Sequence, residues 1–292
     1  MKDFEYTAAT TLEEAVGLLA KSGDRARILT GGTDLIVQLR EGLRDADLVV
    51  DVKKIPDLMQ IAYSAERGLC LGAGVPCHRV YEHADIARHY PGLVDAARII
   101  GGWQIQSRAS IGGNLCNASP AADSIPILIA LRAICRIAGP NGERLLPVHE
   151  FCIGPGKNAL KSGELLVAME FPAPSPHSSS AYERFIPRNE MDIAVVGVGA
   201  WVRLDETDNT IEKARIGLGA VAPTPLLGAE ASDWLKGKPA TEQTFSAAAD
   251  IAMKAARPIS DKRGPAEYRT HLVGVLTKRT LSTAVDRAKP PS

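Results

Sequence analysis

Near the start of the chain, apolar residues recur with helical spacing and then give way to short apolar runs. Residues 7–22 follow a helical period, and Thr10 or Thr11 is a suitable N-cap for this helix. A strand at 27–29, a helix from Asp34 and a second strand at 47–52 are expected next. This order predicts a small βαβ-like unit that ends near residue 55.

The middle of the chain combines strand-like and helix-like patterns. The predicted elements are a hairpin of strands at 58–63 and 68–71, helices at 80–89 and 93–100, and strands at 133–137 and 165–171. A stretch of small polar residues, Ser107 to Pro126, lies among them and fits neither pattern. Residues 56 to about 172 are therefore expected to form an α+β unit around this stretch.

A run rich in proline and serine, residues 172–180, interrupts these patterns. Such a run cannot continue a helix or a central strand, because proline lacks a backbone N–H group. The expected elements beyond it are strands at 193–204 and 211–219 around a turn at 205–209, then helices at 226–235, 242–256 and 266–288. The pattern predicts an α+β protein with two domains, residues 1–174 (subdomains 1–55 and 56–174) and 175–292, the second an antiparallel sheet packed on helices.

The stretch Ser107–Pro126 carries only two charged residues, Arg108 and Asp123, and is rich in Gly, Ser, Asn and Ala. That composition disfavours both a helix and a regular strand. The adjacent Gly112 and Gly113 tolerate positive φ and let a ligand approach the backbone, and exposed N–H groups in such a loop can cradle an anion. The stretch is either a loop that wraps a phosphate-bearing cofactor or a buried connection between strands.

A second pair of glycines lies in residues 29–35, Leu-Thr-Gly-Gly-Thr-Asp-Leu, between a predicted strand and a predicted helix. In a strand–Gly-Gly–helix arrangement, backbone N–H groups and the helix dipole favour a diphosphate. The alternative is that Thr33 or Asp34 simply caps the helix.

Composition narrows the possible classes of function. The chain has 34 basic and 34 acidic residues, with no basic cluster interleaved with aromatics, which argues against a nucleic-acid binder. It has neither an apolar run long enough for a membrane span nor the apolar core of a signal peptide, so we expect a cytoplasmic protein. Hydrolase, zinc-protease and P-loop motifs do not occur. The cysteines show no C-x-x-C spacing and are expected to be reduced thiols without a metal cluster: Cys70, Cys77, Cys116, Cys135 and Cys152.

The two glycine motifs together resemble those of a known family. T-G-G-T-D-L at 30–35 and S-I-G-G-N-L at 110–115, followed by A-S-P-A-A-D at 118–123, are similar to the two FAD-binding signatures of molybdenum hydroxylases. The match is to their medium, flavin-carrying subunit, as in xanthine dehydrogenase and carbon monoxide dehydrogenase, and covers nearly the whole chain. The resemblance implies a two-part N-terminal FAD-binding domain of the vanillyl-alcohol-oxidase/PCMH type, followed by a C-terminal antiparallel sheet packed on helices.

The resemblance also implies which residues bind FAD. Residues of both motifs would hold the diphosphate, while Asp123 would bond a ribityl or ribose hydroxyl, unless it only caps a helix at 124–131. Leu165 and Leu166 would pack near the flavin or adenine, and Arg184 takes a position often held by Lys beside the flavin. The full set is Leu29, Thr30, Gly31, Gly32, Thr33, Asp34, Ser110, Gly113, Asn114, Ala118, Ala122, Asp123, Leu165, Leu166 and Arg184. No catalytic residue and no metal ligand is expected.

Finally, the resemblance implies a path for electrons. A large partner subunit with a molybdenum cofactor would hydroxylate an organic substrate, and a small partner with two [2Fe–2S] clusters would carry the electrons to FAD on this chain. The FAD would pass them to NAD, a quinone or oxygen. We expect a dimer of heterotrimers, with one rim of the FAD site at a subunit interface. Two alternatives stay open, a stand-alone FAD-dependent oxidase or dehydrogenase and a cofactor-free assembly scaffold.

Overall fold

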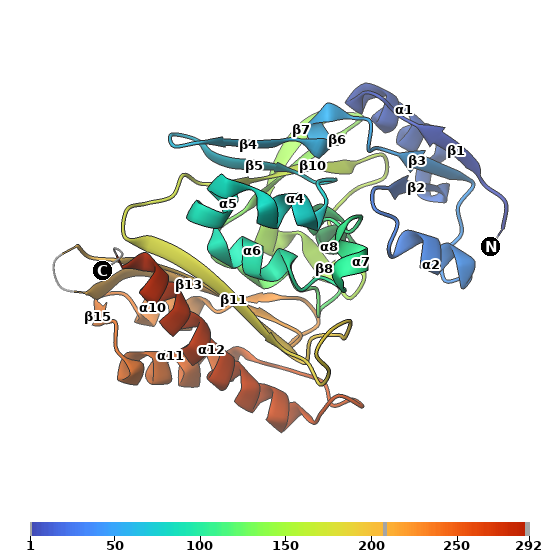
Figure 1. Ribbon diagram of the computed structural model, residues 1–292. Coiled ribbons are helices and arrows are strands. Elements are labelled where there is room, and N and C mark those ends of the chain that lie inside the picture. The colour runs from blue at the N-terminus through green and yellow to red at the C-terminus, as the bar shows by residue number, and fades with distance from the viewer. Residues whose placement is uncertain (1, 207–208, 290–292) are drawn as a thin grey trace.

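The structure is a computed structural model that describes residues 2–206 and 209–289 (Figure 1). An N-terminal unit lies at one side of a central sheet, and helices α4, α5 and α6 lie between that sheet and the C-terminal sheet (Figure 1). Within the described residues, none of the helices is long and apolar enough to cross a membrane.

The N-terminal unit is a parallel sheet with strand order β1-β3-β2. Its elements are β1 (Glu5–Ala8), α1 (Leu12–Ser22), a 3₁₀ turn (Gly23–Arg25), β2 (Ala26–Leu29), α2 (Leu35–Arg40) and β3 (Leu48–Asp51). β2, α2 and β3 form the predicted βαβ unit, because β2 and β3 pair in parallel. The prediction of a helix from Thr7 is wrong, since Thr7 belongs to β1. The helix begins only after Thr11, whose Oγ1 accepts from the backbone N–H of Glu14 at 3.1 Å.

The central sheet is antiparallel, with strand order β4-β5-β10-β6-β7. Its elements, with the short helix before them, are α3 (Pro56–Met59), β4 (Ile61–Ser64), β5 (Gly68–Gly72), β6 (Ile134–Gly139), β7 (Gly142–Pro147) and β10 (Leu165–Phe171). The predicted hairpin is confirmed, but its first strand begins at Ile61 and not at Leu58. Pro56 starts a helical turn there, because its fixed φ suits the first helical position.

Helices and a small hairpin fill the space beside this sheet. They are α4 (Cys77–Glu82), α5 (Ala84–His89), α6 (Pro91–Ala97), α7 (Trp103–Gln106), α8 (Ile111–Asn117), α9 (Ile125–Ala130), a 3₁₀ turn (Val148–Glu150), β8 (Cys152–Gly154) and β9 (Lys157–Asn158). The single helix predicted over 80–89 is two helices, because the backbone of His83 is extended (φ −78°, ψ 119°). The next predicted helix ends at Ala97 and not at Ile100.

The C-terminal sheet is antiparallel in the order β11-β12-β13-β14, with β15 also paired to β13. Its elements are β11 (Ser178–Phe185), β12 (Val196–Leu204), β13 (Thr210–Gly219), β14 (Leu226–Leu227), α10 (Ala229–Trp234), β15 (Lys238–Pro239), α11 (Glu242–Ala255) and α12 (Ala266–Ala288). The predicted antiparallel sheet packed on helices is confirmed, because buried residues of β12 and β13 share one core with α11 and α12. Leu226–Leu227 is a strand and not the start of a helix. The turn predicted over 205–209 lies partly outside the described residues.

Candidate functional site

A cleft of about 620 Å³ separates the N-terminal unit from the central sheet and its helices. Its walls come from residues 30–35 after β2, from residues 109–123 around α8, and from residues 158–166 before and within β10. Ligand sites in proteins commonly measure about 300–1,000 Å³. The cleft therefore has room for a large organic ligand.

The two glycine motifs, far apart in sequence, lie against each other in this cleft. A Cβ atom on Gly31 would lie 2.0 Å from the carbonyl oxygen of Arg108, so the first motif packs directly on the backbone before the second. A Cβ on Gly113 would lie 3.0 Å from Ser110 Oγ and 3.5 Å from Thr30 Oγ1. Small residues therefore let both motifs face one volume.

The prediction that Ser107–Pro126 is a loop is wrong in its middle, because residues 111–117 form α8. The Oγ of Ser110 caps this helix by accepting from the N–H of Gly113 at 3.0 Å. Gly112 faces the other way, where a Cβ would lie 2.4 Å from the carbonyl oxygen of Ala73. Close packing and the cap thus outweigh the low helix propensity of two glycines. Neither glycine has positive φ.

The first motif has the predicted strand–Gly-Gly–helix arrangement. Gly32 takes positive φ (76°) between β2 and α2. Asp34 is the N-cap residue of α2, but its side chain makes no capping hydrogen bond. It lines the cleft instead, where Asn117 Nδ2 donates to its Oδ1 at 3.4 Å. Burial raises the pKa of Asp34 above its ordinary value, although the positive charge of Arg44 acts to lower it.

Asn114, which lies in α8, connects this helix to α9. Its Oδ1 accepts from the backbone N–H of Ser124 at 3.1 Å and from the Ser124 hydroxyl at 2.6 Å. Ser124 is the N-cap residue of α9 and has no side-chain cap of its own. Asn114 therefore fixes the start of α9, and with it the preceding residue, Asp123.

Asp123 is buried at the wall of the cleft and does not cap α9. Its Oδ2 accepts from Arg184 Nη1 at 2.6 Å, and its Oδ1 accepts from the hydroxyl of Tyr182 at 3.2 Å. Burial raises the pKa of Asp123, while Arg184 and Tyr182 act in the opposite direction. The result is a buried, hydrogen-bonded ion pair with one face toward the cleft.

Most of the predicted site residues line this cleft. They are Thr30, Gly31, Gly32, Thr33, Asp34, Ser110, Gly113, Asn114, Ala122, Asp123 and Leu166. Leu165 does not, because side chains alternate along β10 and it packs into the core shared with α1 and β3. Leu29 packs with Leu39 and Val49, and Ala118 forms the left-handed C-cap of α8. Arg184 does not line the cleft itself, but it donates to two residues that do, to Asp123 at 2.6 Å and to the carbonyl oxygen of Asp192 at 3.5 Å.

Sequence reasoning missed several residues of the cleft. Arg27 and Arg44 from the N-terminal unit and residues 158–164 line it. No motif marks these positions, and only the folded chain brings them together. Tyr182, which does not line the cleft but donates to Asp123, was also missed, although it stands two residues before Arg184 and so on the same face of a strand.

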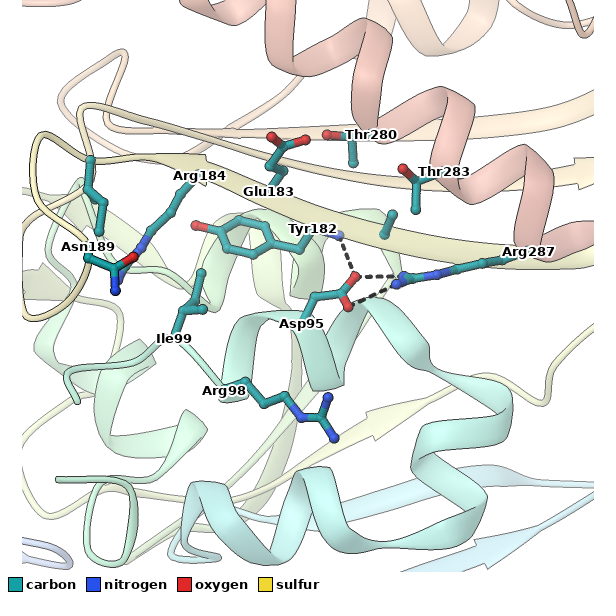
Figure 2. Close-up of a pocket in the computed structure, with 12 residues that line it drawn as sticks. Asp95, Arg98, Ile99, Tyr182, Glu183, Arg184, Asn189, Thr280, Thr283 and Arg287 are labelled. Atoms are coloured by element: carbon teal, nitrogen blue, oxygen red, sulfur yellow. Dashed lines mark hydrogen bonds and ion pairs between the residues drawn. The ribbon is translucent and has the colours of Figure 1, made fainter. Parts of the chain in front are cut away.

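Tyr182 and Arg184 line a second cavity, of about 460 Å³ (Figure 2). Residues of α6, β11 and α12 line it. Asp95 of α6 accepts from the backbone N–H of Tyr182 at 3.1 Å and pairs with Arg287 of α12 at 2.6 Å (Figure 2). Arg287 also donates to the carbonyl oxygen of Ser180 at 3.0 Å. β11 is an edge strand, so these contacts occupy its outer side.

Two family models and a curated relative match this chain over most of its length. Residues 2–174 match the family described as FAD binding domain in molybdopterin dehydrogenase, and residues 180–284 match the CO dehydrogenase flavoprotein C-terminal domain. A putative xanthine dehydrogenase FAD-binding subunit of Escherichia coli K12 is 34% identical, over 99% of this chain and 98% of that protein.

Two solved structures have the same fold. A chain of carbon monoxide dehydrogenase from Hydrogenophaga pseudoflava matches with a TM-score of 0.93 at 31% identity, covering 98% of both chains. A chain of quinoline 2-oxidoreductase from Pseudomonas putida 86 matches with a TM-score of 0.89 at 30% identity, covering 99% of both chains. The chain therefore belongs to the family of FAD-binding subunits of molybdenum-containing hydroxylases, the family of xanthine and carbon monoxide dehydrogenases.

Proposed function

We propose that this chain binds FAD in the cleft between the N-terminal unit and the central sheet and uses it to transfer electrons within a molybdenum hydroxylase complex. Bound FAD would supply the redox chemistry, accepting one or two electrons at a time, while the chain binds, orients and tunes it. One observation carries the proposal: two glycine motifs about eighty residues apart form adjacent walls of a single cleft.

The diphosphate would lie where the two motifs meet. Gly113 presents no side chain there, and the nearest polar atoms are the hydroxyl oxygens of Ser110 and Thr30. Ser110 accepts from Gly113 N–H, which leaves its own hydroxyl proton to donate to a phosphate oxygen. Backbone N–H groups of residues 31–34 would provide further donors, as at other diphosphate sites.

Asp123 would bind a hydroxyl of the cofactor. Both of its oxygens already accept one hydrogen bond, and an ionised carboxylate offers about four acceptor sites, so it retains capacity for a donor in the cleft. Arg184 would keep a permanent positive charge behind this carboxylate. That charge would favour the reduced, anionic form of a flavin close to it.

We propose that the rim of the cleft near Trp103 is a subunit interface. Trp103 is 80% exposed, Met191 54% and Ile193 50%. Ile193 lines the cleft, and Met191 packs against Gly102 beside Trp103. Exposed large apolar side chains gathered at one place commonly mark a site for a partner protein. The partners would be a small [2Fe–2S] subunit that delivers electrons and a large molybdenum-cofactor subunit.

The remaining features of the proposed assembly are supported by the resemblance to the family. We propose cytoplasmic dimers of heterotrimers, with electrons leaving FAD for NAD, a quinone or oxygen. Within the chain we propose an FAD-binding domain over residues 1–174 and a C-terminal domain over residues 175–292.

The first test is a visible absorption spectrum of the purified chain and of the supernatant after heat denaturation. Oxidised-flavin bands and released FAD are expected. A flat spectrum that incubation with FAD leaves unchanged would contradict the proposal. Co-expression with the two candidate partners should then give a complex that co-elutes. The W103A variant should still bind FAD but lose co-elution, whereas L145A, which truncates an exposed leucine on β7 outside the cleft lining, should keep it.

A further inference from the structure

We infer that Tyr182 is a positioning residue, which holds the Asp123 carboxylate in the orientation needed to accept a hydrogen bond from a hydroxyl of the bound cofactor. The inference rests on the proposed function. It concerns a residue that neither glycine motif contains, which lines the second cavity (Figure 2) and donates to Asp123 at the wall of the cleft.

The contacts of Asp123 are divided between two donors. Arg184 Nη1 holds Oδ2 at 2.6 Å, and the Tyr182 hydroxyl holds Oδ1 at 3.2 Å. With Arg184 alone, the carboxylate could rotate about its terminal torsion, which has only a broad preference. With both donors in place, rotation would break at least one hydrogen bond. The remaining acceptor sites therefore keep a fixed direction.

Tyr182 is itself held from several sides. Its ring is buried, and its backbone N–H donates to Asp95, which is paired with Arg287. Gly197 of β12 leaves the space for its hydroxyl, because a Cβ at that position would lie 2.6 Å from the Tyr182 oxygen. These contacts hold the phenol oxygen within hydrogen-bonding distance of Asp123 Oδ1.

The electrostatics agree with a donor role. Burial raises the pKa of Tyr182 well above its ordinary value, so its hydroxyl keeps the proton at any physiological pH. From β11, Arg184 and Tyr182 oppose the effect of burial on the pKa of Asp123. α9 presents no titratable side chain, and Cys116 of α8 and Asp192 of the segment before β12 line the same cleft.

The sign of the pH effect follows from these groups. Asp123 accepts from a cofactor hydroxyl best when ionised, so FAD affinity should fall as the pH drops through the Asp123 pKa of the FAD-free chain. Tyr182→Phe removes one group that lowers this pKa. The fall in affinity should therefore begin at a higher pH in Y182F than in the wild type.

The experiment compares the wild type with Y182F and with Y90F as a matched control. Tyr90 is also buried, and its hydroxyl donates to the carbonyl oxygen of Pro172 at 2.9 Å, away from the cleft lining. FAD titrations from pH 5 to 8 measure Kd by flavin fluorescence. We expect Y182F to raise Kd roughly five- to tenfold at neutral pH, the effect of one hydrogen bond, and Y90F to leave it unchanged.

Two further measurements separate positioning from mere loss of stability. In a D123N background, Y182F should have little added effect on Kd, since the two residues act as a unit. In the FAD-free chain, the carboxyl ¹³C signal of Asp123 should titrate at higher pH in Y182F than in the wild type. If Y182F does not fold, the G197A variant replaces it in these measurements, because the added methyl group displaces the same hydroxyl.

Additive effects of D123N and Y182F, an unchanged Asp123 titration, or equal effects of Y182F and Y90F would each overturn the inference. If the wild-type chain binds no FAD, the proposed function fails. The Asp123 titration still decides whether Tyr182 controls this carboxylate.

Discussion

Three glycine-to-alanine substitutions distinguish effects on the stability of the fold from effects on ligand binding. Gly112 and Gly113 are neighbours in α8 but face different surroundings, and Gly17 lies inside α1 with nothing within 4 Å of the place that a Cβ would take. Inside a helix, alanine is favoured over glycine by about 1 kcal/mol. This gain is common to all three variants, so differences among them report the surroundings of the added methyl group.

The structure gives the size of each effect. In G112A the methyl would lie 2.4 Å from a backbone oxygen of Ala73, which cannot give way easily, so we expect a net loss of about 1–3 kcal/mol in the free energy of unfolding. In G113A the methyl would lie 3.0 Å from Ser110 Oγ, which can move, so stability should change by less than about 1 kcal/mol. G17A should be more stable than the wild type.

FAD binding should rank the variants differently from stability. The G113A methyl group would project where the diphosphate is proposed to lie, and we expect Kd to rise at least tenfold, about 1.4 kcal/mol. G17A should leave Kd unchanged. Urea denaturation followed by circular dichroism gives the stabilities, and fluorescence titration gives Kd. A folded G113A variant with wild-type affinity would refute the placement of the diphosphate against α8.

Three further predictions concern charge and thiols. R184A should lose about 3–5 kcal/mol of stability by urea denaturation, because Asp123 is left buried without its cation, while R184K should retain most of it. Arg144 donates to both oxygens of Glu164 and so lowers the pKa of that carboxyl. E164Q should therefore reduce the melting temperature at pH 7, with a difference that shrinks as the pH falls through the Glu164 pKa of the folded chain. Burial raises the pKa of Cys116 to about 12, so this thiol should react with iodoacetamide at pH 8 only after the chain is unfolded. Mass spectrometry measures the labelling.

Sequence patterns predicted most strands and helices because their apolar periods are long. β10, for example, begins and ends at the predicted residues, since seven consecutive residues pack between other strands of the sheet. The helix α8 could not be predicted, because its composition argues against it. What stabilises it is the contact of Gly112 with Ala73, and that contact exists only in the folded chain.

Some residues of the candidate site could be predicted from the sequence and others could not. Both glycine motifs line the cleft, because the shortness of their side chains is itself a local signal for close approach. Leu165 was chosen with its neighbour Leu166, although adjacent residues of a strand face opposite sides. Arg27 and Arg44 carry no such signal, since a single arginine in a sequence is most often a surface residue.

The contacts of Arg287 have a consequence for solubility. An eight-residue edge strand such as β11 offers unpaired backbone groups to any other strand, and this is a common route to aggregation. Here Arg287 donates to the outward carbonyl of Ser180, and Asp95 accepts from the outward N–H of Tyr182. A strand from another molecule would therefore meet two charged side chains where it would have to pair. Arg287 lies in the last turn of α12, beyond the residues matched by the C-terminal family. The final turn of this helix therefore opposes edge-to-edge association of the sheet.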